Sequence, residues 1–142
     1  MQSFSNELHR NIMTTSFTET IVKHYGRGDL MKKILSGLDA SGKLLSGDNN
    51  VALQVDDLAP IDEFHSRGRE GTIDLCKMAK TIYPTDRVLD IGCGFGGTAR
   101  HLADKYQLRH QVMGVDLTQE YVDVGNQLNE MVGLKDKISI VQ

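Results

Sequence analysis

Three short apolar runs divide the second half of the chain, and the segments between them have the period of a helix. The runs occupy residues 88–91, 111–115 and 137–141. Between them, at 98–106 and 118–132, apolar side chains recur every three or four residues, as on one face of a helix. Short strands that alternate with helices indicate an α/β fold with a parallel sheet. Two right-handed crossovers would place the three strands in the order 3-2-1.

The first half of the chain has helical patterns and a turn-rich connector. A capping-box sequence at 16–19 predicts a helix that ends at Gly26, and Asp29 can cap a second helix. Residues 41–50 predict a connector. A further helix should end before Pro84, with an inward face of Ile73, Leu75, Cys76, Ala79 and Ile82. We therefore divide the chain into a helical N-terminal arm with a linker, 1–60, and a nucleotide-binding unit, 61–142.

A glycine-rich turn, residues 92–97, joins the first apolar run to the helix that follows it. Glycines permit positive φ and a close approach of main chain to a ligand, and the helix start offers free N–H groups. The spacing Gly92-x-Gly94-x-x-Gly97 also fits a dinucleotide pattern, which leaves an NAD(P)-binding oxidoreductase open. Asp90 favours a ligand with an ammonium group over a dinucleotide, because its carboxylate would attract the ammonium and would repel a pyrophosphate.

A second carboxylate, Asp116, follows the second apolar run. The carboxyl ends of parallel strands are where open α/β sheets bind their ligands. A carboxylate in that place can accept hydrogen bonds from both hydroxyls of a ribose. The alternative is that Asp116 only caps the helix that begins near Thr118, although Thr118 is itself the better cap.

The pattern Asp90-x-Gly92-x-Gly94-x-Gly96 resembles the first motif of the class I S-adenosylmethionine-dependent methyltransferases. The resemblance covers residues 61–142, and the whole chain is similar to the N-terminal portion of the sarcosine and dimethylglycine N-methyltransferase group. It implies a Rossmann-like fold that binds S-adenosyl-L-methionine. It also implies methyl transfer to a small-molecule acceptor, with amines among the candidates.

The same resemblance implies roles for individual residues. Asp90 would organise the turn and the amino end of the cofactor. The main chain of the turn would approach the cofactor, Asp116 would hold the ribose, and Leu117 would pack on the adenine. The turn residues concerned are Gly92, Cys93, Gly94 and Gly96. No catalytic residue is implied, because positioning and desolvation supply most of such catalysis.

A charged stretch at 56–70 leads into the helix before the first strand. In the family that this chain resembles, this helix packs beside the cofactor. Arg67 or Arg69 could therefore pair with the cofactor carboxylate through a charge-assisted hydrogen bond. The alternative is an exposed helix start, where both arginines form surface pairs with Asp62, Glu63 or Glu70. His65 borders this stretch and receives no role.

Composition argues against several classes of function and site. The net charge of −3 argues against a general nucleic-acid surface, and no apolar run approaches the ~20 residues that span a bilayer. Cys76 and Cys93 do not form a disulfide framework, and the five histidines lack metal-ligand spacing. A reactive thiol at Cys93 is not favoured, because no neighbour supplies a base. We expect a cytoplasmic protein with neither a metal nor a membrane anchor.

The chain ends after the third predicted strand, whereas class I methyltransferases continue with four more. We therefore expect a fragment, in which strand one has an unpaired edge and promotes association, with a homodimer as one outcome. Besides the methyltransferase, two alternatives stay open. One is the NAD(P)-binding oxidoreductase, and the other is a non-catalytic module that binds a partner or a second copy through the sheet edge.

Overall fold

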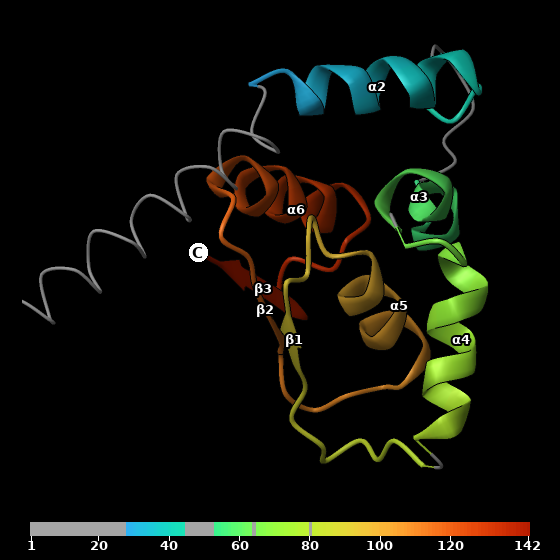
Figure 1. The fold of residues 1–142 in the computed structure, drawn as a ribbon, viewed down its shortest axis with the longest axis vertical. Coiled ribbons are helices and arrows are strands. Elements are labelled where there is room, and N and C mark those ends of the chain that lie inside the picture. The colour runs from blue at the N-terminus through green and yellow to red at the C-terminus, as the bar shows by residue number, and fades with distance from the viewer. Residues whose placement is uncertain (1–27, 45–52, 64, 80) are drawn as a thin grey trace, which may run out of the picture.

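The computed structural model describes residues 28–44, 53–63, 65–79 and 81–142. The helix expected at 16–25 lies outside these ranges. A three-stranded parallel sheet forms the centre of the fold, with β1 (Leu89–Ile91), β2 (Val112–Val115) and β3 (Ile138–Val141) in the order β1-β2-β3 (Figure 1). Asp90 pairs with Gly114, which in turn pairs with Ile140. The predicted parallel sheet and its strand order are confirmed.

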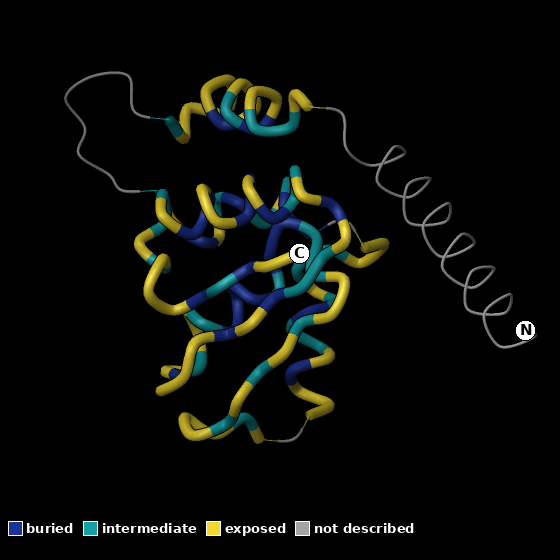
Figure 2. The backbone as a smooth tube through the Cα atoms, turned by 90° about the vertical axis from the view of Figure 1, so that its left-hand side faces the viewer, coloured by how far each residue is buried: buried dark blue, intermediate teal, exposed yellow. Residues whose placement is uncertain are grey.

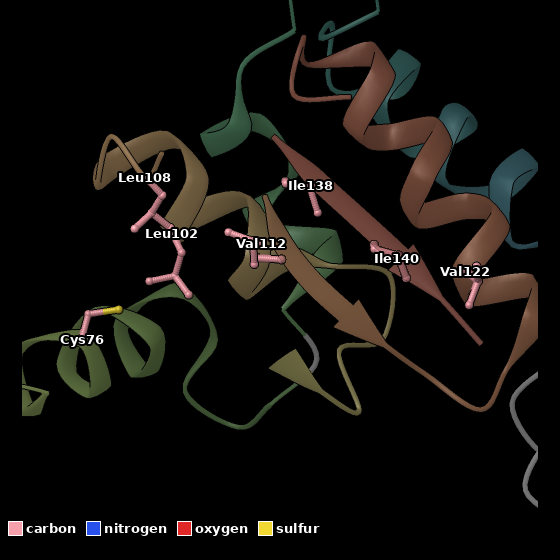
Figure 3. Packing of buried hydrophobic residues seen from close by; sticks show 8 residues of the cluster. Cys76, Leu102, Leu108, Val112, Val122, Ile138 and Ile140 are labelled. Carbon is pink, nitrogen blue, oxygen red and sulfur yellow. The ribbon is translucent and has the colours of Figure 1, made fainter. Parts of the chain in front are cut away.

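Helices α5 (Gly97–Lys105) and α6 (Gln119–Met131) connect the strands and cover one face of the sheet. That face presents Val112, Ile138 and Ile140, which pack with Ala99 and Leu102 of α5 (Figure 3). On the other face, the apolar side chains of Leu89, Ile91, Met113 and Val141 are exposed. Parallel sheets are normally apolar on both faces because both are covered. Within the described ranges, only one face of this sheet has such a cover.

Helix α6 is buried on two sides. Val122 points toward the sheet, whereas Val124 and Leu128 belong to a second apolar cluster with Ile34 and Leu38 of helix α2 (Leu30–Ala40). The carboxylate of Glu120 accepts hydrogen bonds from the N–H groups of Gly28 and Leu30, both at 2.9 Å. Helix α2 is thereby fastened to α6 at its N-terminal end. Figure 2 shows the buried side of α2 toward the rest of the fold.

Two further helices precede the sheet, α3 (Val55–Asp62) and α4 (Gly68–Met78). Both contact α5 and each other. Helix α3 was not predicted, and the expected boundary between residues 60 and 61 falls inside it. The inward face predicted for α4 is partly wrong. Cys76 is buried, but Leu75 is 63% exposed and Ala79 is exposed, because α4 meets its neighbours along the edge that carries Thr72 and Cys76. None of the described helices is long and apolar enough to cross a bilayer.

The fully buried guanidinium of Arg100 on α5 connects these elements. It forms an ion pair with Asp62 at the end of α3, with nitrogen to oxygen distances of 3.0 Å. It also donates to the carbonyl of Phe95 in the glycine turn at 2.5 Å, and to the side chain of Asn129 on α6 at 2.7 Å. Burial lowers the pKa of Arg100 and raises the pKa of Asp62, although each attracts the charged form of the other. Three segments far apart in the sequence therefore meet at one side chain.

We expect Arg100→Met to lower the free energy of unfolding by about 3–5 kcal/mol, because it leaves the buried carboxylate of Asp62 without its counter-charge. Lys105→Met on the same helix is the control, because the Lys105 side chain is 46% exposed and its pairs contribute about 0–1 kcal/mol. Urea denaturation of the 142-residue chain measures both variants. Equal effects of the two substitutions would contradict the structural role of Arg100.

Candidate functional site

The glycine turn lies at the carboxyl end of β1, where it leads into α5. Gly92, Gly94 and Gly96 have φ values of +71°, +56° and +90°, in the left-handed region that favours glycine. The N–H groups of Gly92 and Cys93 both donate to the carbonyl of Val115, at 2.9 and 3.1 Å. The turn is thereby tied to the end of the neighbouring strand, β2.

Two of the glycines in the turn are required by packing. A Cβ atom at Gly96 would lie 2.6 Å from Cδ1 of Ile140, and one at Gly97 would lie 2.3 Å from the carbonyl oxygen of Asp62. Gly92 differs, because a Cβ atom there would meet no described atom within 4 Å. The main chain at Gly92 therefore borders open space, as a turn that receives a ligand requires.

Asp116 links the turn to the start of α6. Its Oδ2 accepts a hydrogen bond from the N–H of Gly94, and its Oδ1 accepts one from the N–H of Thr118, both at 2.9 Å. Thr118 occupies the N-cap position but makes no cap hydrogen bond with its own side chain. Asp116 therefore binds the N-cap residue, and not an N–H group within the first turn of α6. Each carboxylate oxygen can accept a further hydrogen bond, so a ligand role remains available to Asp116.

Asp90 lies on the covered face of β1. Its Oδ2 is buried and has no hydrogen-bond partner among the described residues. Burial raises the pKa of Asp90, and the negative charge of Asp116 raises it further. An unpartnered carboxylate oxygen at the end of a strand is costly, and a donor group from a ligand would relieve that cost.

Cys93, in the same turn, carries a thiol that the charges of Asp90 and Asp116 influence. Burial, followed by the charges of Asp90 and Asp116, raises the pKa of Cys93 to about 12. A thiol with such a pKa is a poor nucleophile at neutral pH. The side chain also packs closely on β2, since a Cβ atom at Gly114 would lie 2.8 Å from its sulfur. These observations agree with a contact through the main chain of Cys93 and disfavour a reactive thiol.

The remaining predicted site residues lie at two places around the turn. Leu117 follows Asp116 and is 51% exposed, so its side chain can pack on a planar ligand. Arg67 lies at the N-cap position of α4 and forms an ion pair with Asp74 at 2.5 Å. Arg69 instead pairs with Glu63 at 2.8 Å, a partner that the sequence suggested, but the pair is buried and not at the surface. The pairing of Arg67 with a cofactor carboxylate stays a prediction.

A hollow of about 420 Å³ runs along α4 from the segment before it to Met78, and it reaches Thr98 at the start of α5. Its polar lining includes His65, Arg67 and Thr98, and its apolar lining includes Leu75 and Met78. The sequence predicts no role for His65 and only a surface pair for Glu63. One feature of the sequence indicates this cluster, because Glu63, His65 and Arg67 occur together directly before a helix. Their spacing alone does not show that Glu63 is buried.

Comparison with known proteins shows similarity to methyltransferases. A methyltransferase domain family matches residues 88–142. A sarcosine/dimethylglycine N-methyltransferase from Halorhodospira halochloris is 31% identical over 94 residues, which are 66% of this chain and 32% of the relative. Ajmaline N-methyltransferase from Rauvolfia serpentina is 40% identical over 52 residues, which are 37% of this chain and 17% of the relative. Residues 88–142 are thus similar to a methyltransferase domain, and these relatives are methyltransferases by name.

Solved structures agree with this fold. Geranyl diphosphate C-methyltransferase from Streptomyces coelicolor A3(2) superposes with a TM-score of 0.56 at 20% identity, covering 88% of the chain and 46% of that protein. The cyclase SpnF superposes with a TM-score of 0.53 at 18% identity, covering 87% of the chain and 41% of that protein. The class I methyltransferase fold is thus present in part. The chain spans a third or less of the length of the curated relatives it matches.

The packing around Gly96 predicts that substitution in the glycine turn lowers stability. We expect Gly96→Ala to lower the free energy of unfolding by about 3 kcal/mol, since it combines left-handed strain with overpacking against Ile140. Gly133→Ala is the matched control, because Gly133 has φ +71° but open space around it, and should cost about 1 kcal/mol. Urea denaturation measures the difference. Equal losses would show that the contact with Ile140 imposes no constraint.

Proposed function

We propose that this chain forms the cofactor-binding part of an S-adenosylmethionine-dependent methyltransferase that methylates a small molecule. The observation that carries the proposal is the acidic edge formed by Asp90 and Asp116 around the glycine turn. A pyrophosphate placed there would face two carboxylates, whereas a ligand with an ammonium group and ribose hydroxyls would find acceptors for both. S-adenosylmethionine carries these groups and supplies an electrophilic methyl when bound.

The predicted residues fit the parts of this cofactor. Asp116 can accept hydrogen bonds from ribose hydroxyls, and Leu117 can cover the adenine. Asp90 has a buried oxygen without a donor, which suits the amino group. The main chain at Gly92, Cys93, Gly94 and Gly96 allows the close approach, and we keep Arg67 as the partner of the carboxylate.

The acceptor is proposed as an amine. Support comes from relatives named N-methyltransferases, so secondary amines such as sarcosine are the acceptors to test first. The NAD(P)-binding oxidoreductase is not favoured, because the acidic edge opposes a pyrophosphate. The non-catalytic binding module retains one supporting observation, the exposed side chains of Leu89 and Ile91 on β1. The homodimer and the cytoplasmic location stay predictions.

Calorimetric titration with S-adenosylhomocysteine, with NADH as the competing ligand, tests the cofactor. We expect saturable binding of the first alone. Asp116→Ala should weaken this binding at least about tenfold, because it removes a charged hydrogen-bond acceptor. Asp123→Ala on the exposed side of α6 is the matched control and should leave the affinity unchanged. Unchanged affinity in Asp116→Ala would remove Asp116 from the site, and binding of NADH alone would overturn the proposed cofactor.

The raised pKa of Asp90 predicts a pH dependence. Because an ammonium group favours the ionised carboxylate, binding should strengthen as the pH rises through this pKa, and in that pH range it should release a proton. In the empty protein the folded state holds this proton more tightly than the unfolded chain. The contribution of Asp90 to the free energy of unfolding is therefore complete below the ordinary carboxyl pKa, and it is lost as the pH rises through the raised pKa.

Calorimetry in two buffers of different ionisation enthalpy measures the released proton. Asp90→Asn should abolish the release, whereas the surface variant Asp123→Ala should retain it. A release of the same size in Asp90→Asn would assign the proton to another group.

A further inference from the structure

A buried carboxylate, Glu63, lies against the glycine turn without belonging to the motif. Its side chain is fully buried, and its Cγ would lie 2.8 Å from a Cβ atom at Gly97. The hydroxyl of Thr72 donates to its Oε2 at 2.8 Å, and the Arg69 guanidinium lies 2.8 Å from its Oε1. Glu63 therefore has a counter-charge on one side and a hydroxyl donor on the other.

His65 completes this cluster. Its Nε2 lies 3.4 Å from Oε2 of Glu63 and 3.3 Å from the hydroxyl oxygen of Thr72. Because the Thr72 hydroxyl already donates its hydrogen to Glu63, we assign the neutral ring a hydrogen on Nε2, which leaves Nδ1 as an acceptor. The pair thus has the arrangement of a proton acceptor supported by a carboxylate.

The ring of His65 rests on Gly71 of α4. A Cβ atom at Gly71 would lie 3.0 Å from Cβ of Arg67, and 3.1 Å from Cε1 and 3.2 Å from Nδ1 of the imidazole. Gly71 thus lets the ring approach the helix. The side chain remains 46% exposed and lines the hollow beside the turn.

The hollow connects His65 with the cofactor turn. Thr98, in the first turn of α5, follows the glycines directly and lines the same space. Leu75 and Met78 form an apolar wall, and Arg67 pairs with Asp74 in the empty protein. The lining thus offers a protic group one acceptor, His65, and offers methyl groups an apolar surface.

We propose that this hollow binds the methyl acceptor, an amine, and that His65 accepts its proton. The inference rests on the proposed function and specifies its acceptor site. Most aliphatic amines are ammonium ions at neutral pH and have no lone pair with which to attack. In the proposed step an N–H bond of the ammonium breaks, its electron pair stays on nitrogen, and the proton bonds to Nδ1. The side chain of Glu63, 3.4 Å from Nε2, supports the imidazolium that forms.

Nitrogen NMR of the 142-residue chain with ¹⁵N-labelled histidine tests this role without an activity assay. His65→Gln identifies the signal. The free chain should show the Nε2–H tautomer of His65. With S-adenosylhomocysteine bound, sarcosine or dimethylglycine should shift the Nδ1 signal saturably, while the signal of the exposed His110 stays constant.

Gly71→Ala supplies a variant that displaces the ring without changing its chemistry. Because alanine is favoured in helices, α4 should remain folded. We expect the affinity for the amine to fall about tenfold or more, and a smaller change in the affinity for S-adenosylhomocysteine would report the displacement of Arg67. Gly37→Ala in α2 is the matched control, since a Cβ atom there meets nothing within 4 Å.

The outcomes separate this proposal from the proposed function. An Nδ1–H tautomer, an Nδ1 signal that responds to neither amine, or equal amine affinities in the Gly71→Ala and Gly37→Ala variants would overturn the role of His65. These results leave binding of S-adenosylhomocysteine intact. Failure to bind S-adenosylhomocysteine would instead contradict the proposed function, and the tautomer of the free chain would still decide whether His65 has the acceptor form.

Discussion

The geometry of the site depends on one buried cation. The guanidinium of Arg100 needs several acceptors, because an unpaired charge in the interior is costly. It finds them at the end of α3, in the glycine turn and on α6. The turn is therefore held through the carbonyl of Phe95 while its glycines supply the unusual backbone angles. Through Asp62, the same cation also positions the segment that carries Glu63 and leads to His65.

The charge around the turn determines which ligands fit it. Asp116 already accepts hydrogen bonds from the N–H groups of Gly94 and Thr118. Asp90, in contrast, keeps one buried oxygen without a partner in the described part of the chain. Such an edge suits a ligand that brings hydrogen-bond donors and positive charge. The fold alone would not decide this, because methyltransferases and the cyclase SpnF share it. The chemistry of the proposed cofactor follows from side chains that the fold positions.

Two kinds of residue make up the proposed site. Asp90, Asp116 and the glycines follow strands, so the ends of a parallel sheet bring them together. Glu63, Thr72 and His65 come from a loop and a helix whose positions depend on packing against α5. The first group offers acceptors to a cofactor, and the second lines the adjacent hollow. Gly97 joins them, because its lack of a side chain lets the segment of Asp62 and Glu63 touch the turn.

The sequence by itself determined the parallel strands, their order, the glycine turn and the placement of Asp90 and Asp116. Apolar runs and glycines act over a few residues, so their consequences can be predicted locally. The tertiary structure decided the existence of α3, the exposure of Leu75 and the burial of Glu63. It also decided the role of Arg100, whose partner Asp62 lies 38 residues earlier in the chain. Such features depend on which helices pack together, and no local pattern contains that information.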